Sequence, residues 1–184
     1  MAARGRYILM VDADGATQFS DLKRLQSEAS RIESKGFSVA VGSRSHLQSD
    51  AVATRSFVRT ILMYGFHFLV QSLCVRGISD TQCGFKLFSR AAARLLFPNL
   101  HVERWAFDVE LLFMARRLGI PLVEVPVNWK EVDGSHLNPA LASLQMARDL
   151  FRIRVMYILG IWSLHRNTKE HYEKAVADAA VKGK

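Results

Sequence analysis

An apolar run that ends in two acids, at residues 7–14, constrains the fold of this chain more than any other stretch. Residues 7–11 read Tyr-Ile-Leu-Met-Val, which is too short for an amphipathic helix and is typical of a strand buried on both faces of a parallel sheet. Asp12 and Asp14 follow at once, and alternate residues of an extended chain point to the same side. Gly15 then permits a sharp turn. We therefore predict a strand with two carboxylates at its carboxyl end.

The Asp12–Asp14 pair has two interpretations. Ligands of open α/β sheets bind at the carboxyl edge of the strands, and hard carboxylate oxygens suit Mg²⁺ or Mn²⁺ held against a diphosphate. The alternative is a solvated loop whose acids cap the following helix. The motif alone does not decide between them, because short motifs often match by chance.

The next segments predict a strand–helix–strand unit. Ser20 precedes a helical pattern over about residues 21–35 with one apolar face, made of Leu22, Leu25, Ala29 and Ile32. Gly36 ends this helix, and residues 37–42 indicate a second strand. Such a unit is expected to have parallel strands and a right-handed crossover.

Arg44 leaves the second strand at the edge of the sheet where the two acids are expected. The planar guanidinium of an arginine suits phosphate oxygens, so Arg44 could bind a phosphate that a metal ion also holds. The alternative is an exposed loop arginine without a specific role.

Several further elements follow from local patterns. Residues 77–84 form a polar loop with glycines that leads into a short strand, and Ser89 can cap a short helix that reaches Pro98. Residues 107–118 predict an amphipathic helix ending at Gly119. Residues 121–127 indicate a strand whose two prolines favour an edge position, and residues 128–138 form a second polar loop.

Two segments are unusually hydrophobic. Residues 56–75 predict a helix whose charge-free part is about four residues short of a membrane span. Residues 139–166 predict a long helix in which Trp, Tyr and arginines accompany a dense apolar set. Each could lie in a lipid interface, or the two could pack against each other in the core. The remaining residues, 167–184, form a polar tail that is expected to fray.

The net charge limits the classes of partner. The chain has 184 residues, is 49% hydrophobic and carries a formal charge of +8, which fits one folded domain with an anionic partner. Arg/Lys runs interleaved with aromatics, helix-turn-helix patterns and zinc-finger spacings are all absent from the sequence. A phosphate-bearing substrate or a membrane surface is therefore favoured over nucleic acid. Cys74 and Cys83 form no C-x-x-C motif, which favours a reducing environment.

At this point the sequence resembles the inverting sugar transferases of the GT-A fold that load a nucleotide-activated sugar onto a polyprenyl phosphate. Within that group it is most similar to the dolichyl-phosphate β-glucosyltransferases. Four motifs carry the resemblance, at residues 11–17, 41–44, 80–88 and 127–135. Long matching runs make it specific, and they lie at residues 63–70, 80–86 and 101–112.

The resemblance implies a Rossmann-like α/β core of the GT-A type that is incomplete at its amino terminus, with long apolar interfacial helices. Residues 1–139 would be the carboxyl-terminal part of the catalytic domain, including the interfacial helix at 56–75. Residues 140–166 would form a membrane-interface helix. Only six residues precede the first strand, whereas relatives bind the nucleotide base with upstream segments. We therefore expect this chain to be inactive on its own.

The resemblance also implies an activity, namely transfer of glucose from UDP-glucose to dolichyl phosphate at the cytosolic face of the endoplasmic reticulum membrane. Asp12 and Asp14 would hold Mg²⁺ or Mn²⁺ with the diphosphate, and Arg44 and Arg59 would grip the acceptor phosphate. Further residues implied to contact the substrates are Asp80, Gln82, Lys86 and Trp129. The sequence departs from the family pattern at Ala16, where a glutamine often stands, and at His136, where a lysine is usual.

Two other functions stay open. A dolichyl-phosphate mannose synthase would share the motifs but would use GDP-mannose as the donor. A non-catalytic basic module that binds a membrane surface would share the charge and the apolar helices. The sequence predicts no particular protein partner.

Overall fold

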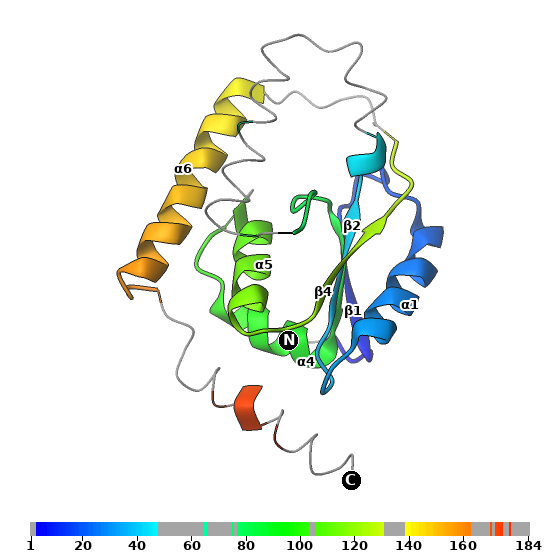
Figure 1. Ribbon diagram of the computed structural model, residues 1–184. Coiled ribbons are helices and arrows are strands. Elements are labelled where there is room, and N and C mark those ends of the chain that lie inside the picture. Colours follow the sequence, from blue (N-terminus) through cyan, green and yellow to red (C-terminus); the bar gives the residue numbers. More distant parts are fainter. Residues whose placement is uncertain are drawn as a thin grey trace.

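The computed structural model of the chain is a mixed α/β fold built on one sheet (Figure 1). It describes residues 3–47, 65, 75, 77–103, 106–130, 139–162, 170, 172–174 and 177. Within this part of the chain the sheet has the strand order β1-β3-β2-β4. The strands are β1 (Tyr7–Val11), β2 (Val39–Ser43), β3 (Phe85–Ser89) and β4 (Leu122–Pro126).

The central strand is β3, which runs antiparallel to both of its neighbours. Its residue Lys86 pairs with Met10 of β1 on one side and with Val41 of β2 on the other. We predicted that the strands at 7–11 and 37–42 form a parallel unit, and β1 and β2 do run in the same direction. They are not neighbours, however, because β3 lies between them.

The burial of the individual strands is consistent with this order. Every residue of β3 and of β2 is buried, whereas β1 is only half-buried and ends at the exposed Val11. The expectation that the 7–11 strand is buried on both faces was therefore wrong for the described sheet. The predicted edge position of the proline-flanked strand is confirmed, since β4 pairs only with β2 among the described strands.

Helices cover both faces of the sheet (Figure 1). Helix α1 (Leu22–Ile32) packs on one face, where Leu25 and Ala29 join Ala40, Phe85 and Leu87 in a buried cluster. The other face carries α4 (Arg90–Leu96) and α5 (Phe107–Arg117). Helix α6 (Pro139–Ile158) packs outside α5 and adds Leu150, Ile153 and Tyr157 to that core. Two short 3₁₀ turns, Phe19–Asp21 and Phe97–Asn99, precede α1 and follow α4.

Local signals set most helix ends. The Ser89 hydroxyl accepts a hydrogen bond from the Ala92 N–H (3.3 Å), which confirms it as the cap of α4. Gly119 has φ 72°, as expected just after a helix. Ser20 does not cap α1: it lies in the 3₁₀ turn, and helix α1 is shorter than the predicted 21–35. Helix α6 ends at Ile158, before the predicted residue 166.

The predicted apolar helix at 56–75 lies outside the described residues, apart from the helical Gly65 and the buried Val75. In the described part of the chain, none of the helices combines the length and the apolar character needed to cross a bilayer. The 167–184 tail was expected to fray, but the described Tyr172 packs edge-on against Phe37 with ring centroids 4.9 Å apart. That aromatic contact holds this part of the tail on the folded body.

A fully buried carboxylate, that of Glu110, joins α5 to α6. It accepts hydrogen bonds from the backbone N–H groups of His101 (2.9 Å) and Val102 (2.8 Å) and from the Tyr157 hydroxyl (3.1 Å). Burial, and then the Glu110 carboxylate, raise the pKa of Tyr157, so this hydroxyl remains a donor. The His101 ring nitrogen Nδ1 also lies 2.9 Å from this carboxylate. All four groups would lose their partner together if the carboxylate were removed.

We predict that Glu110→Ala lowers the free energy of unfolding by about 2–4 kcal/mol, because it leaves buried donors unsatisfied. The measurement is urea unfolding followed by circular dichroism. Glu103→Ala is the control, because Glu103 is exposed nearby. Equal stability of the two variants would contradict the role of Glu110.

Candidate functional site

The two predicted carboxylates lie where β1 ends. The Asp12 N–H donates to the Gly84 carbonyl (2.8 Å), which extends the β1–β3 pairing by one residue. The Asp12 carboxylate rests directly against Gly84, so that a Cβ at residue 84 would overlap it. The Asp14 carboxylate accepts the Ala16 N–H (2.9 Å), and Gly15 between them has φ 72°. Asp12 and Asp14 are both exposed, so both could reach a ligand.

A forked ion pair joins the end of β2 to the loop that precedes β3. Nε and Nη2 of Arg44 donate to the two carboxylate oxygens of Asp80 at 2.7 and 2.9 Å, and the Arg44 N–H donates to the same carboxylate at 2.9 Å. The loop is also fixed from β4, because the Glu124 carboxylate accepts the N–H groups of Ser79 and Asp80. The Arg44–Asp80 pair therefore links the end of β2, the loop before β3 and strand β4.

The ion pair governs the charge state of the site. Burial alone would raise the pKa of Asp80, but the hydrogen bonds and charge of Arg44 outweigh it and hold the pKa below its ordinary value. Burial likewise opposes the charge of Arg44, yet Asp80, and to a smaller degree Asp12, raise its pKa. Both groups are charged at neutral pH, and Asp12 is close enough to act on Arg44.

A second charged pair lies beneath the first, inside the core. Lys86 is fully buried, and its ammonium donates to Asp108 at the start of α5 (2.8 Å) and to the Cys83 carbonyl (2.6 Å). Burial raises the pKa of Asp108, although Lys86 opposes the shift. Burial, and then the charge of Asp80, raise the pKa of Cys83 to about 11, so this thiol is not an activated nucleophile at neutral pH.

The described residues 128–130, which follow β4, close one side of the site. Thr17 and Trp129 form an isolated antiparallel bridge, flanked by hydrogen bonds from Gln18 N–H to the Asn128 carbonyl and from Lys130 N–H to the Ala16 carbonyl. The Arg44 guanidinium lies 5.4 Å from the centre of the Trp129 ring, within the range of a cation–π contact. The loop that carries Asp12 and Asp14 is thereby tied to Trp129 and Arg44.

The structure brings most of the predicted site residues to one edge of the sheet, which lies at the upper end of β2 and β4 in Figure 1. Asp12, Asp14, Arg44, Asp80 and Trp129 all lie at this edge. Gln82 is on the same loop, with its amide against the sulfur of Met146 in α6. Arg59 lies outside the described residues.

Lys86 does not lie where a residue in contact with a substrate would be expected. Because its ammonium is enclosed between Asp108 and the Cys83 carbonyl, it supports the loop from below, and direct contact with a substrate stays a prediction. Sequence reasoning missed Asp108 and Glu124. Asp108 lies inside the matching run 101–112 and could have been singled out there, whereas Glu124 carries no motif.

The donor set at this edge fits a hard divalent cation. Asp12 and Asp14 offer exposed carboxylate oxygens one residue apart, and the hydrogen bond from Ala16 uses only one of the Asp14 oxygens. Among the described residues, no third Asp, Glu, His or Cys completes a metal cluster with them. Mg²⁺ is commonly held by one or two carboxylates together with substrate phosphates and water, so the pair is sufficient when a diphosphate is present.

Comparison with known proteins identifies the relatives of the chain. It is 59% identical to the dolichyl-phosphate beta-glucosyltransferase of Dictyostelium discoideum over 165 residues, which are 89% of this chain and 50% of that protein. The chain is a homologue of the dolichyl-phosphate beta-glucosyltransferases. The enzymes of Drosophila melanogaster and Homo sapiens are 57% and 52% identical over 89% and 91% of the chain.

The chain spans about half the length of the curated relatives it matches. No protein-family model matches it. The resemblance read from the motifs is therefore confirmed as homology over about half of a dolichyl-phosphate beta-glucosyltransferase.

We predict a pH-dependent stability contribution from Asp80. Its pKa is lower in the folded chain, so the contribution is complete above the unfolded value near 3.8 and is lost as the pH falls through the folded pKa. Asp80→Asn should cost about 2–4 kcal/mol at about pH 6 because Arg44 loses a part-buried charged partner. The difference from the parent chain should shrink toward about pH 3, as measured by urea unfolding.

The control for this prediction is Asp149→Asn, which removes an exposed ion pair with Arg148 on α6. It should change stability by less than about 1 kcal/mol at either pH. An Asp80→Asn penalty that stays constant down to the lower pH would contradict the ion-pair account.

Proposed function

We propose that this chain forms the metal- and phosphate-binding part of a GT-A-fold, inverting glycosyltransferase that transfers glucose from UDP-glucose to dolichyl phosphate. The observation that carries the proposal is the 59% identity to the Dictyostelium discoideum enzyme over 89% of the chain. The mixed sheet with two carboxylates at the end of β1 is consistent with part of a GT-A core.

The donor side of the site is assigned to Asp12 and Asp14. Their carboxylates would hold Mg²⁺ or Mn²⁺ against the UDP diphosphate, and such an ion stabilises the charge that develops on the leaving UDP. The close contact of Asp12 with Gly84 fixes where that carboxylate lies, and the Asp14 turn with Ala16 fixes the other. Both ligands are therefore positioned before the donor arrives, which reduces the ordering cost of binding.

The acceptor side is assigned to Arg44, with Arg59 proposed to act beside it. A phosphate monoester has a second pKa of about 6, so the nucleophile is already ionised at neutral pH and needs no general base. It needs charge neutralisation and orientation. The fork to Asp80 uses two of the N–H donors of Arg44 and sets the plane of the guanidinium, while Trp129 covers one of its faces.

Such an arrangement supports a single displacement. The acceptor phosphate oxygen attacks the anomeric carbon as UDP leaves from the opposite side, so an α-linked donor gives a β-linked product. Asp80 and Lys86 act as positioning residues in this proposal, because each touches a neighbouring group of the site through hydrogen bonds. Gln82, on the same loop, is proposed to contact the substrate.

The lipid acceptor places the reaction at a membrane surface, which we propose is the cytosolic face of the endoplasmic reticulum. Helix α6 has the side chains for this contact: Leu144, Phe151 and Ile158 recur every seven residues and are between 62% and 70% exposed. Arg148, Arg152 and Arg154 lie among them and are exposed too. An amphipathic helix with a basic polar flank lies in the plane of the interface.

The function is tested with a chimera in which this chain replaces the matching half of the Dictyostelium discoideum relative. The purified chimera is given dolichyl phosphate, a divalent ion and either radiolabelled UDP-glucose or GDP-mannose. Labelled lipid formed from UDP-glucose alone is the expected result. Product from GDP-mannose would support the mannosyl alternative, and no product from either donor would contradict the proposal. The same assay on the chain alone tests whether the other half is required.

For the metal assignment we predict that Asp14→Asn in the chimera lowers the rate of transfer by about a hundredfold or more. The amide oxygen can still accept the Ala16 N–H, so the turn is kept while the anionic ligand is lost. The control is Glu28→Gln on α1, which removes one exposed carboxylate far from the edge. A near-normal rate for Asp14→Asn would rule out this ligand.

A further inference from the structure

A basic pocket lies between the carboxyl end of α5 and the second half of α6. It has a volume of about 570 Å³ and is lined by Phe113, Arg116 and Arg117 of α5 and by Arg154, Tyr157 and Ile158 of α6. The pocket is separate from the edge that carries Asp12. Asp108 at the start of α5 faces that edge, and Arg116 lies more than two helical turns further along, at a distance of about 12 Å.

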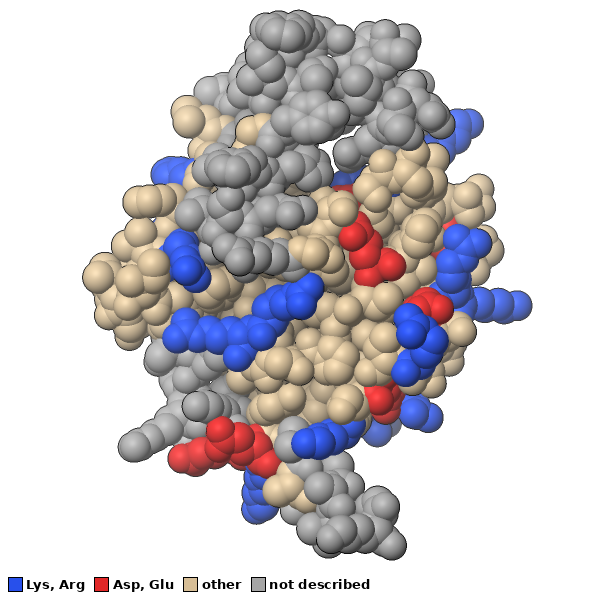
Figure 2. Space-filling model, in the orientation of Figure 1, with Lys and Arg blue, Asp and Glu red and all other residues tan. Residues whose placement is uncertain are grey.

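The pocket has the charge of an anion site. Three arginines line it, and none of the described residues that line it is acidic. Figure 2 shows a blue band of Lys and Arg side chains across the surface between α6 and α5. The Arg117 guanidinium lies 5.6 Å from the centre of the Tyr157 ring, which limits its motion and presents its edge. Guanidinium groups at such spacing suit phosphate oxygens.

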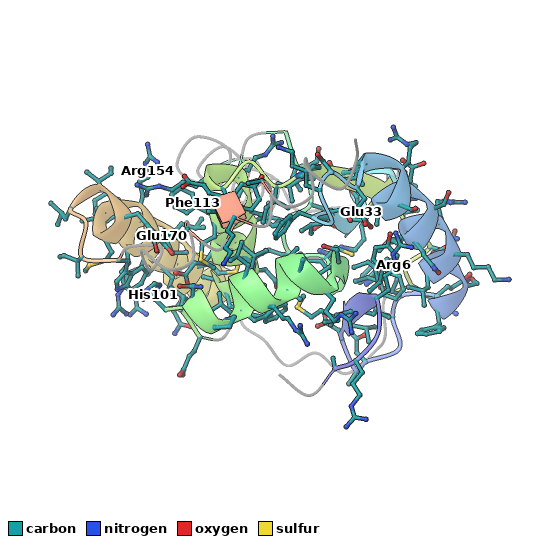
Figure 3. All side chains as sticks on the ribbon, turned by 90° about the horizontal axis from the view of Figure 1, so that it is seen from below. Arg6, Glu33, His101, Phe113, Arg154 and Glu170 are labelled. Atoms are coloured by element: carbon teal, nitrogen blue, oxygen red, sulfur yellow. The ribbon has the colours of Figure 1, made fainter. Side chains whose placement is uncertain are left out.

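The pocket is continuous with the apolar row on α6. Ile158 belongs both to the row and to the pocket wall, and it is 66% exposed. Arg154 lies three residues after Phe151 and four before Ile158, so the three side chains are neighbours on the helix surface. Figure 3 shows the labelled Arg154 of α6 beside Phe113 of α5. An occupant of the pocket would therefore lie at the border between the arginines and the apolar row.

We propose that this pocket binds the phosphate of an anionic phospholipid headgroup when α6 lies on the bilayer. The inference rests on the membrane part of the proposed function. With Phe151 and Ile158 in the acyl boundary, the guanidinium groups of Arg117 and Arg154 come to the level of the headgroup phosphates. The volume exceeds that of a phosphate and accommodates the glycerol as well. The site would fix how the chain is rotated on the membrane.

The test compares two double variants of the chain that keep its net charge. Arg117→Lys with Arg154→Lys changes the pocket, and Arg148→Lys with Arg152→Lys changes the other flank of α6. Because the charge is unchanged in both variants, general attraction to an anionic surface is unchanged. Each variant loses two guanidinium groups, but only the first loses those that line the pocket. Binding is measured by sedimentation with phosphatidylcholine vesicles that contain about one-fifth phosphatidylserine.

We expect the pocket variant to bind these vesicles about tenfold more weakly, and the flank variant within about twofold of the parent chain. Equal binding by both variants would overturn the headgroup site while leaving the membrane contact intact. A parent chain that fails to bind vesicles would overturn both. The single variant Arg154→Lys, with circular dichroism of every protein, shows that a loss does not come from unfolding.

A second arm separates the lipid from free phosphate. Inorganic phosphate is titrated into the chain without vesicles and then against vesicle-bound chain. Weak binding that leaves the vesicle complex intact at about millimolar phosphate supports a headgroup held together with its acyl chains. Tight binding of inorganic phosphate that Arg154→Lys abolishes would identify a soluble anion as the ligand and overturn the lipid assignment.

Discussion

The ion pair between Arg44 and Asp80 is the contact on which the arrangement of the candidate site depends. It joins the end of β2 to the loop before β3, while Glu124 of β4 holds the backbone of that loop. Since Arg44 also lies on Trp129, and Trp129 is bridged to the loop after β1, one guanidinium connects the ends of four strands. The cost of burying these charges is offset only because the fork and the backbone N–H groups satisfy the Asp80 carboxylate.

Two further buried charges fix α5 against its neighbours. Lys86, the second residue of β3, reaches Asp108 in the first turn of α5. Glu110, two residues later and on the other side of that helix, binds the His101 segment and Tyr157 of α6. An apolar core of the same volume could be equally stable. The ionic contacts instead specify one rotation of α5, with Asp108 toward the site and Arg117 toward α6. This rotation sets the directions that the two proposed phosphate sites face.

Local patterns in the sequence predicted the elements better than their order. The Ser89 cap, the end of α5 before Gly119 and the edge strand β4 each depend on one or two residues and were confirmed. The insertion of β3 between β1 and β2 depends on pairs far apart in the sequence, such as Val41 with Lys86 and Tyr7 with Ser89, which periodicity does not encode. The same limit decides which residues of the candidate site could be predicted from the sequence. The carboxylates after β1 and Arg44 after β2 could be predicted from strand ends, whereas the enclosure of Lys86 by Asp108 could not, because an acid in the first turn of a helix usually reflects the helix dipole.

The central claim is that the two carboxylates at the carboxyl end of β1 form a metal-dependent binding site for a nucleoside diphosphate, beside Arg44 at the end of β2. The most direct measurement is the anomalous difference map of crystals of the chimera grown with Mn²⁺ and UDP. The account predicts a manganese peak within coordination distance of the Asp12 and Asp14 carboxylates, about 2.2 Å, with the diphosphate on the side of Arg44. A manganese peak bound elsewhere, or UDP bound without contact to either carboxylate, would contradict it.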